Sequence, residues 1–154
     1  MNISIVYATY SNSTLLASEV LKNALTAQGH VVSLHTAADA TSEVLTTPEL
    51  LILASPSWDY DGQQGMPHED FAALQQRVGA VGLNGKPTAV LALGDSSFTY
   101  FCGAADHLTE WLQTNGASEA AAPLKIDQYY ADEVGAQKLI ADWATTLMTA
   151  TANQ

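Results

Sequence analysis

The 154-residue sequence is poor in basic residues and contains one cysteine. Five Lys and Arg residues stand against sixteen Asp and Glu residues, which gives a formal net charge of −11 at pH 7. Nucleic-acid binding depends on basic side chains that neutralise phosphates, so we expect no nucleic-acid partner, and anionic membranes are disfavoured for the same reason. The single thiol, Cys102, excludes an internal disulfide and a cysteine-rich metal site. A thiol without a partner is typical of a reducing compartment.

Long hydrophobic runs are also absent. The apolar stretches reach about six residues, whereas a membrane-spanning helix needs roughly 20. The first residues carry no basic segment of the kind found in signal peptides, so we expect a cytoplasmic protein. Hydrophobic residues nevertheless make up 47% of the chain, which is ample for a packed core. At this length we expect a single domain over residues 1–154.

Apolar runs and amphipathic segments alternate along the whole chain. Continuous apolar runs are typical of strands buried on both faces of a parallel sheet. We expect such strands at residues 3–8, 31–34, 50–54, 88–93 and, as a split strand, 118–126. This alternation predicts an α/β fold with a doubly wound, five-stranded parallel sheet in the order 2-1-3-4-5 and helices on both faces.

The intervening segments show the spacing of helices that bury one face. Helices are predicted over residues 13–28, 39–45 and 69–78, and two more flank the fifth strand. Residues 55–67 are expected to form a long loop, since they are rich in Ser, Asp, Gly and Pro. The last helix is predicted to bury a stripe of five residues: Val134, Leu139, Ile140, Trp143 and Leu147.

Three polar loops follow the first, third and fourth strands. In the order 2-1-3-4-5 these strands are neighbours, and the chain reverses direction between the first and the third. Ligands bind at the carboxyl ends of strands beside such a switch point. We therefore expect residues 9–14 (the phosphate loop), 55–62 (the first ring loop) and 94–103 (the second ring loop) to meet at one edge of the sheet.

The phosphate loop is rich in hydroxyl and amide groups and stands directly before a predicted helix. The amino end of a helix carries about half a positive charge and free N–H donors, so it attracts phosphate without a cation. The loop lacks lysine, arginine and the glycine motifs of triphosphate and dinucleotide sites. A hydroxyl here could instead serve as an ordinary helix cap. One cap needs one hydroxyl, however, and four cluster in six residues.

Each ring loop carries a large aromatic residue in polar surroundings, Trp58 in the first and Phe98 in the second. Such a residue either covers the edge of the core or stacks on a ligand. Two of them at neighbouring strand ends favour the stacking of a flat ring. Together with a phosphate loop, this is the arrangement of a site for flavin mononucleotide (FMN). Tyr100 and Phe101 could line its wall or belong to the core.

Three segments resemble the flavodoxin family: Tyr7–Thr14, Ser55–Trp58 and, most specifically, Leu93–Ala104 with its Gly-Asp-Ser-Ser-aromatic-x-Tyr-Phe-Cys-Gly string. The resemblance spans essentially the whole chain and implies a flavodoxin-like fold of the short-chain type. It implies a low-potential one-electron carrier with bound FMN rather than an enzyme. The implied FMN-binding residues are Thr9, Tyr10, Ser11, Asn12, Ser13 and Thr14; Ser55, Pro56, Ser57, Trp58, Asp59, Tyr60 and Gly62; and Leu93, Gly94, Asp95, Phe98, Tyr100, Phe101 and Cys102.

The chain departs from the family pattern at three positions. Asn12 replaces a glycine of the phosphate loop, and asparagine tolerates left-handed backbone better than most residues. Phe98 stands where tyrosine is common, so the stacking surface is kept; Phe98→Ala should weaken FMN binding. Asp59 stands where glycine is frequent, at a peptide that in the family turns over when the flavin is reduced.

A side chain at the turned peptide costs about 1 kcal/mol, and about 1.4 kcal/mol corresponds to 59 mV for one electron. We predict that the one-electron-reduced flavin is less stabilised than in relatives with glycine. A redox titration of Asp59→Gly tests this, and an unchanged first potential would contradict it. Asp59, Asp61 and Asp95 would also place negative charge near the flavin, which lowers the second potential; as an alternative, they are ordinary turn residues.

The acidic composition favours redox partners with basic surfaces, a reductase donor and an acceptor enzyme. We expect a monomer that binds neither nucleic acid nor membranes. Three alternatives stay open at this point: a flavodoxin-like protein dedicated to one partner enzyme, an FMN-dependent quinone or nitro reductase, and a binding module without flavin. The four histidines show no metal-ligand spacing, and no hydrolase nucleophile motif is present.

Overall fold

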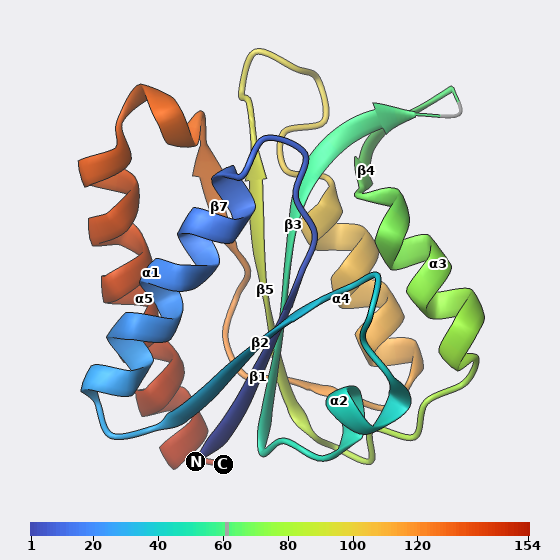
Figure 1. Cartoon of the computed structure of the whole chain (residues 1–154), viewed down its shortest axis with the longest axis vertical. Coiled ribbons are helices and arrows are strands. Elements are labelled where there is room, and N and C mark those ends of the chain that lie inside the picture. The colour runs from blue at the N-terminus through green and yellow to red at the C-terminus, as the bar shows by residue number, and fades with distance from the viewer. Residues whose placement is uncertain (61) are drawn as a thin grey trace.

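A computed structural model describes residues 1–60 and 62–154 as helices packed on both faces of a central sheet (Figure 1). Hydrogen-bonded neighbours run in the order β2-β1-β3-β5-β6, and all of these pairs are parallel. The strands are β1 (Asn2–Tyr7), β2 (Val31–Thr36), β3 (Leu50–Tyr60), β5 (Pro87–Gly94), β6 (Ser118–Glu119) and β7 (Leu124–Asp127), with β4 (Gln63–Pro67) outside this path. The predicted parallel order is therefore confirmed.

Two strand details differ from the simple five-stranded picture. The fifth position is shared by β6 and β7, which pair in turn with β5, as the predicted split strand requires. The segment expected to be a long loop at 55–67 is instead a hairpin, because β3 continues to Tyr60 and pairs antiparallel with β4. The polar, glycine-containing sequence did not indicate these strands, because antiparallel strands that face water need no apolar run.

Helices α1 (Ser13–Ala27) and α5 (Glu133–Ala152) cover one face of the sheet, while α2 (Ser42–Thr46), α3 (Glu69–Val78) and α4 (Ala104–Thr114) cover the other (Figure 1). Each face buries its own cluster of apolar side chains. The buried stripe of α5 contains Ile140, Trp143 and Leu147, as predicted. The prediction was wrong for Val134 and Leu139, which are 79% and 52% exposed, because Ala136 and Ala144 take the inward positions.

The register places the ends of the central strands side by side. Tyr7 of β1 pairs with Ala54 of β3, which in turn pairs with Leu91 of β5. The loops that follow these three strands consequently leave the sheet at one edge, uppermost in Figure 1. In the described part of the chain, no helix combines the length and apolarity needed to cross a membrane.

Candidate functional site

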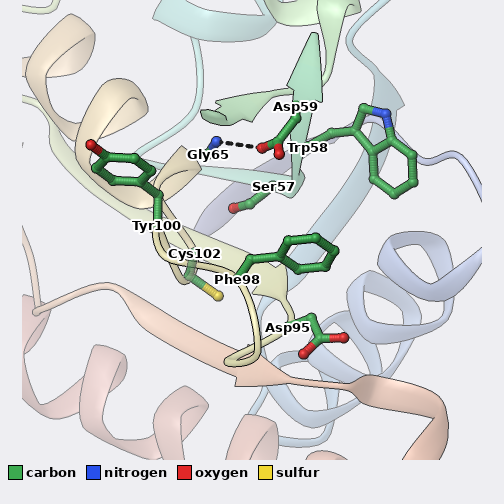
Figure 2. A pocket seen from close by; sticks show the side chains of 8 residues that line it. All are labelled: Ser57, Trp58, Asp59, Gly65, Asp95, Phe98, Tyr100 and Cys102. Atoms are coloured by element: carbon green, nitrogen blue, oxygen red, sulfur yellow. Dashed lines mark hydrogen bonds between the residues drawn. The ribbon is translucent and has the colours of Figure 1, made fainter. Parts of the chain in front are cut away.

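Two adjoining cavities open between the loops at the carboxyl edge of the sheet. The ring cavity, of about 150 Å³, is lined by the two ring loops and Gly65 of β4 (Figure 2). The loop cavity, of about 340 Å³, extends from the ring loops to the phosphate loop and to residues 128–131. Trp58, Asp95 and Phe98 line both, so the three predicted loops do converge on one hollow.

The phosphate loop enters α1 through Asn12, whose backbone is left-handed (φ 69°, ψ −4°). This is the conformation expected of the residue that replaces glycine here. Asn12 precedes the first helical residue, and its side chain makes no capping hydrogen bond. The ordinary-cap interpretation of this loop is therefore wrong at the cap position itself.

Two hydroxyls of the same loop are buried without a hydrogen-bond partner among the described residues. They are Oγ1 of Thr9 and Oγ1 of Thr14, and the Thr14 side chain is fully buried. A buried hydroxyl without a partner costs about 1–3 kcal/mol, so native proteins rarely keep one without a reason. Both groups are donors suited to an anion at the amino end of α1.

Trp58 and Phe98 stand exposed at the rim of the hollow. They are 57% and 60% exposed, and Tyr100 is also 60% exposed. Figure 2 shows the Trp58 and Phe98 rings reaching out on the same side of the ring cavity, one from each ring loop. They leave apolar surface open for a flat ring to cover.

Tyr10 lies between the rings of Trp58 and His68 and packs near both. Its ring centroid lies 5.5 Å from that of Trp58 and 4.0 Å from that of His68, on which it stacks. Its hydroxyl donates to the Glu69 carboxylate. Burial, and then this bond, raise the pKa of Tyr10, while the same bond lowers the pKa of Glu69. His68 is held by its own N–H, which donates to Ser55 Oγ (3.0 Å).

The second ring loop is held by hydrogen bonds to carboxylates. Asp95 accepts from the N–H and the hydroxyl of Ser97 (2.8 and 2.6 Å), which lowers the pKa of Asp95. Ser96 donates to Asp127 through the same two groups. Cys102 is fully buried in a left-handed backbone (φ 52°), and burial raises the pKa of its thiol to about 12. Such a thiol cannot act as a nucleophile near neutral pH.

The β3–β4 hairpin is tied down on both sides. Asp59 Oδ1 accepts from the N–H of Gly65 (3.0 Å), as Figure 2 shows. Asp59 is not among the described residues with positive φ. Gly65 and Gly103 meet backbone to backbone, since a Cβ on Gly103 would come within 2.5 Å of the Gly65 carbonyl oxygen. This contact joins the hairpin to the second ring loop.

Known proteins share this sequence and fold. A family model described as Flavodoxin matches residues 5–143. The chain belongs to the flavodoxin family. It is 31% identical over 153 residues to a flavodoxin of Nitratidesulfovibrio vulgaris, covering 97% of this chain and 98% of that protein. Flavodoxins bind FMN, carry electrons between redox partners and are not enzymes.

Solved flavodoxins superpose over nearly the full chain. Oxidised flavodoxin 2 from Bacillus cereus is 29% identical with a TM-score of 0.82, covering 97% of this chain and 99% of that one. The Fusobacterium nucleatum flavodoxin bound to FMN is 20% identical with a TM-score of 0.77, covering 96% and 97%. At 20% identity this second likeness concerns the fold alone.

In this flavodoxin most of the predicted site residues line the two cavities. The residues that do so are Tyr10, Ser11, Ser13, Pro56, Ser57, Trp58, Asp59, Leu93, Gly94, Asp95, Phe98, Tyr100 and Cys102. Thr9, Asn12 and Thr14 belong to the phosphate loop but are not among the residues that line the two cavities. Ser55 does not line either cavity, and its hydroxyl donates to the Pro56 carbonyl and accepts from the N–H of His68.

Three further predicted residues lie elsewhere in this flavodoxin. Phe101 is half-buried and packs against the core cluster on the α3–α4 face, whereas Tyr100 lines the ring cavity. Tyr60 ends β3, and Gly62 lies in the turn before β4, away from the described lining of both cavities. Asp61 lies outside the described residues.

Sequence reasoning missed Gly65 and the segment 128–131, which line the cavities in this flavodoxin. Gly65 lies within residues 55–67, which were predicted to form a loop rather than strands. The segment 128–131 follows β7 at the same carboxyl edge of the sheet, so the rule that selected the other loops could have found it. Its two adjacent tyrosines, Tyr129 and Tyr130, were the available signal.

Proposed function

We propose that the phosphate loop holds the phosphate of FMN and that Trp58 and Phe98 cover the two faces of its ring. The observation that carries this proposal is that the buried hydroxyls of Thr9 and Thr14 have no hydrogen-bond partner among the residues that the structure describes. A phosphate at the amino end of α1 would give both hydroxyls an acceptor, and charge-assisted bonds of this kind are stronger than neutral ones. The absence of basic side chains in the loop suits a monophosphate rather than a triphosphate.

The fit extends to the ring. Trp58 and Phe98 are more than half exposed and border the same cavities, and contact with a flat aromatic system would cover their apolar surface. We propose that the ring-loop residues that line the cavities also contact the cofactor. Backbone groups of residues 55–60 and 93–95, and of Cys102, would lie toward the ring edge. Pro56, Leu93 and Gly94 offer no ionisable side chain there.

We propose that the protein works as a low-potential one-electron carrier. Bound FMN supplies the electron-accepting ring. The protein places the carboxylates of Asp59 and Asp95 in the wall of the ring cavity, and the bonds from Ser97 keep Asp95 ionised. Fixed negative charge disfavours added negative charge nearby, which lowers the potential. The buried thiol of Cys102 takes no part in proton transfer near neutral pH, since burial raises its pKa to about 12.

We further propose that the redox partners, a reductase donor and an acceptor enzyme, present basic surfaces. The net charge of −11 attracts such surfaces and speeds their encounter with this chain. We also propose a monomeric, single-domain protein of the cytoplasm. Both apolar clusters flank one sheet, and the one cysteine is buried as a free thiol, which suits a reducing compartment.

An anaerobic spectroelectrochemical titration of the FMN-loaded protein tests the proposal. Two separated one-electron steps, with the second at low potential, are expected. A single two-electron bleaching, together with steady oxidation of NAD(P)H by the protein alone, would replace the carrier with a reductase. Protein that takes up no FMN even when it is supplied in excess would remove the function and leave the fold in place.

A further inference from the structure

Residues 128–131 form a fourth wall of the site, beside the phosphate loop and the two ring loops. They follow β7 and comprise Gln128, in a left-handed backbone (φ 44°), and the short 3₁₀ helix Tyr129–Ala131. All of them line the loop cavity together with Ser11 and Ser13 of the phosphate loop. The segment therefore faces the position proposed for the phosphate and its adjoining chain.

This wall is fixed from two sides. The backbone N–H of Gln128 donates to the Gly94 carbonyl (2.8 Å), and its side-chain amide donates to Asp95 (3.3 Å). Tyr129 is buried, at 5% exposure, and packs in the core beneath α1 and α5. The position of Tyr130 is thus set by its neighbours on either side and by the second ring loop.

Tyr130 reaches from this wall to the phosphate loop. Its ring lies edge-on to Tyr129 (centroids 5.7 Å apart, planes at 82°), and it is 53% exposed. Its hydroxyl donates to the backbone carbonyl of Ser11, which is 119 residues away in the sequence. Ser11 immediately precedes Asn12, the residue with left-handed backbone.

The orientation of one peptide plane links these facts. The carbonyl of Ser11 and the N–H of Asn12 belong to the same trans peptide and point in opposite directions. A hydrogen bond that fixes the carbonyl consequently fixes the N–H. Left-handed backbone is unfavourable for any residue with a Cβ, so at Asn12 the surrounding structure has to hold the turn.

We propose that Tyr130 is a positioning residue of the phosphate loop: its hydroxyl holds the Ser11–Asn12 peptide and stabilises the left-handed turn at Asn12 for phosphate binding. The inference rests on the proposed function, because it names the residue that keeps the phosphate loop in its binding geometry. The hydroxyl, rather than the ring, carries this role. The ring alone could only pack on Tyr129 and shield the cavity.

The test uses Tyr130→Phe, which keeps the ring and removes the hydroxyl. One net hydrogen bond corresponds to roughly a two- to tenfold change in an equilibrium constant. We expect the Kd for FMN to rise by about that factor. The N–H of Leu16 donates to the Asn12 carbonyl (2.9 Å), so its amide hydrogen exchange reports on the turn at Asn12. In the FMN-free protein, exchange at Leu16 should accelerate by a similar factor. An unchanged Kd with unchanged exchange at Leu16 would overturn the proposal.

Repeating the Tyr130→Phe change in an Asn12→Gly protein tests whether its effect depends on Asn12. Glycine adopts left-handed backbone without strain, so in Asn12→Gly protein the Tyr130→Phe change should cost less than in the native background. An equal loss of FMN affinity in both backgrounds would overturn the proposal, since the hydroxyl would then act elsewhere.

Riboflavin, which lacks the phosphate, serves as the control ligand, and its affinity should not respond to Tyr130→Phe. A parallel loss of riboflavin and FMN affinity would also overturn the proposal. Failure of the proposed function has a different signature: native protein would take up no FMN. The exchange rate at Leu16, whose N–H donates to the Asn12 carbonyl, would then still report whether Tyr130 holds the loop.

Discussion

The phosphate loop (the phosphate side of the site) and the two ring loops (the ring side) present different chemical groups to the cavities. On the phosphate side, the groups available for binding are short hydroxyl side chains and backbone groups, and the side chain of Thr14 is fully buried. On the ring side, Trp58 and Phe98 stand more than half exposed beside carboxylates. One side is a rigid cradle within the fold, and the other is an apolar rim that only a ligand or partner covers.

The difference shows which forces each half depends on. The phosphate side depends on the direction of individual peptides, which explains why Asn12 and Tyr130 matter there. The ring side depends on surface area and on the spacing of two loops, which the Gly65–Gly103 contact sets. Changes that move backbone should therefore act strongly on both halves, whereas changes of single side chains should separate them.

Gly103→Ala should have the largest effect. A Cβ at this position would lie 2.5 Å from the Gly65 carbonyl oxygen, and backbone on both sides leaves little room to adjust. We expect the free energy of unfolding to fall by about 3 kcal/mol, measured by urea denaturation. Gly82→Ala is the matched control, because its nearest neighbours lie 3.7 Å away. Equal stability of the two variants would show that the ring loops are not held by this contact.

Thr14→Val should separate binding from stability. It removes a buried, unpartnered hydroxyl, so the FMN-free protein should become more stable by about 1 kcal/mol. The same change should weaken FMN binding about 30-fold, since a bond to a charged group is worth about 2 kcal/mol. Ser18→Ala removes another buried, unpartnered hydroxyl of α1 one turn farther along and should leave FMN affinity unchanged. Unchanged FMN affinity in Thr14→Val would disconnect this hydroxyl from the phosphate.

Phe98→Ala should weaken FMN binding about fivefold, because stacking of one aromatic face is worth about 1 kcal/mol. Fluorescence quenching of FMN on binding measures the Kd. Phe98→Tyr keeps the stacking surface and should bind FMN as the native protein does. Since Phe98 is 60% exposed, neither variant should lose stability in the FMN-free form. A loss of stability would place Phe98 in the core instead.

Tyr10→Phe should have the smallest effect, confined to the pH dependence of stability. The bond to Tyr10 lowers the pKa of Glu69, so its contribution to stability is present above the ordinary value of 4.5 and is lost as the pH falls below it. The pKa of Tyr10 is raised, so that contribution is lost as the pH rises above 10.0. In Tyr10→Phe, the free energy of unfolding should depend less on pH both below 4.5 and above 10.0, as measured by urea denaturation. Parallel curves for the two proteins would contradict the coupling.

The parallel sheet was predictable because its signals are local. Continuous apolar runs at residues 50–54 and 88–93 can hardly be anything but buried strands, and the order then fixes the edge where the loops meet. The left-handed backbone of Asn12 was likewise predictable from residue type and family pattern. Trp58 and Phe98 stood out as large aromatics in polar loops.

The remainder depends on contacts that sequence patterns do not encode. The hairpin of β3 and β4 is held by Asp59 and by the close approach of Gly65 to Gly103, which are pairings across the fold. Leu139 is exposed because another stripe of α5 faces the sheet, and alanines occupy part of that buried stripe. The bond from Tyr130 to Ser11 joins residues 119 positions apart, beyond any local rule.

Because Cys102 is buried, the rate at which its thiol is alkylated reports on opening of the second ring loop. Thiol reagents attack the thiolate, and this thiol is sealed between the second ring loop and the sheet, 3.5 Å from the Ala92 carbonyl oxygen. Alkylation therefore requires the loop to open, and its rate reports how much of the open form is populated. A ligand that contacts both Trp58 and Phe98 would hold the loop closed, so added FMN should slow the labelling of Cys102.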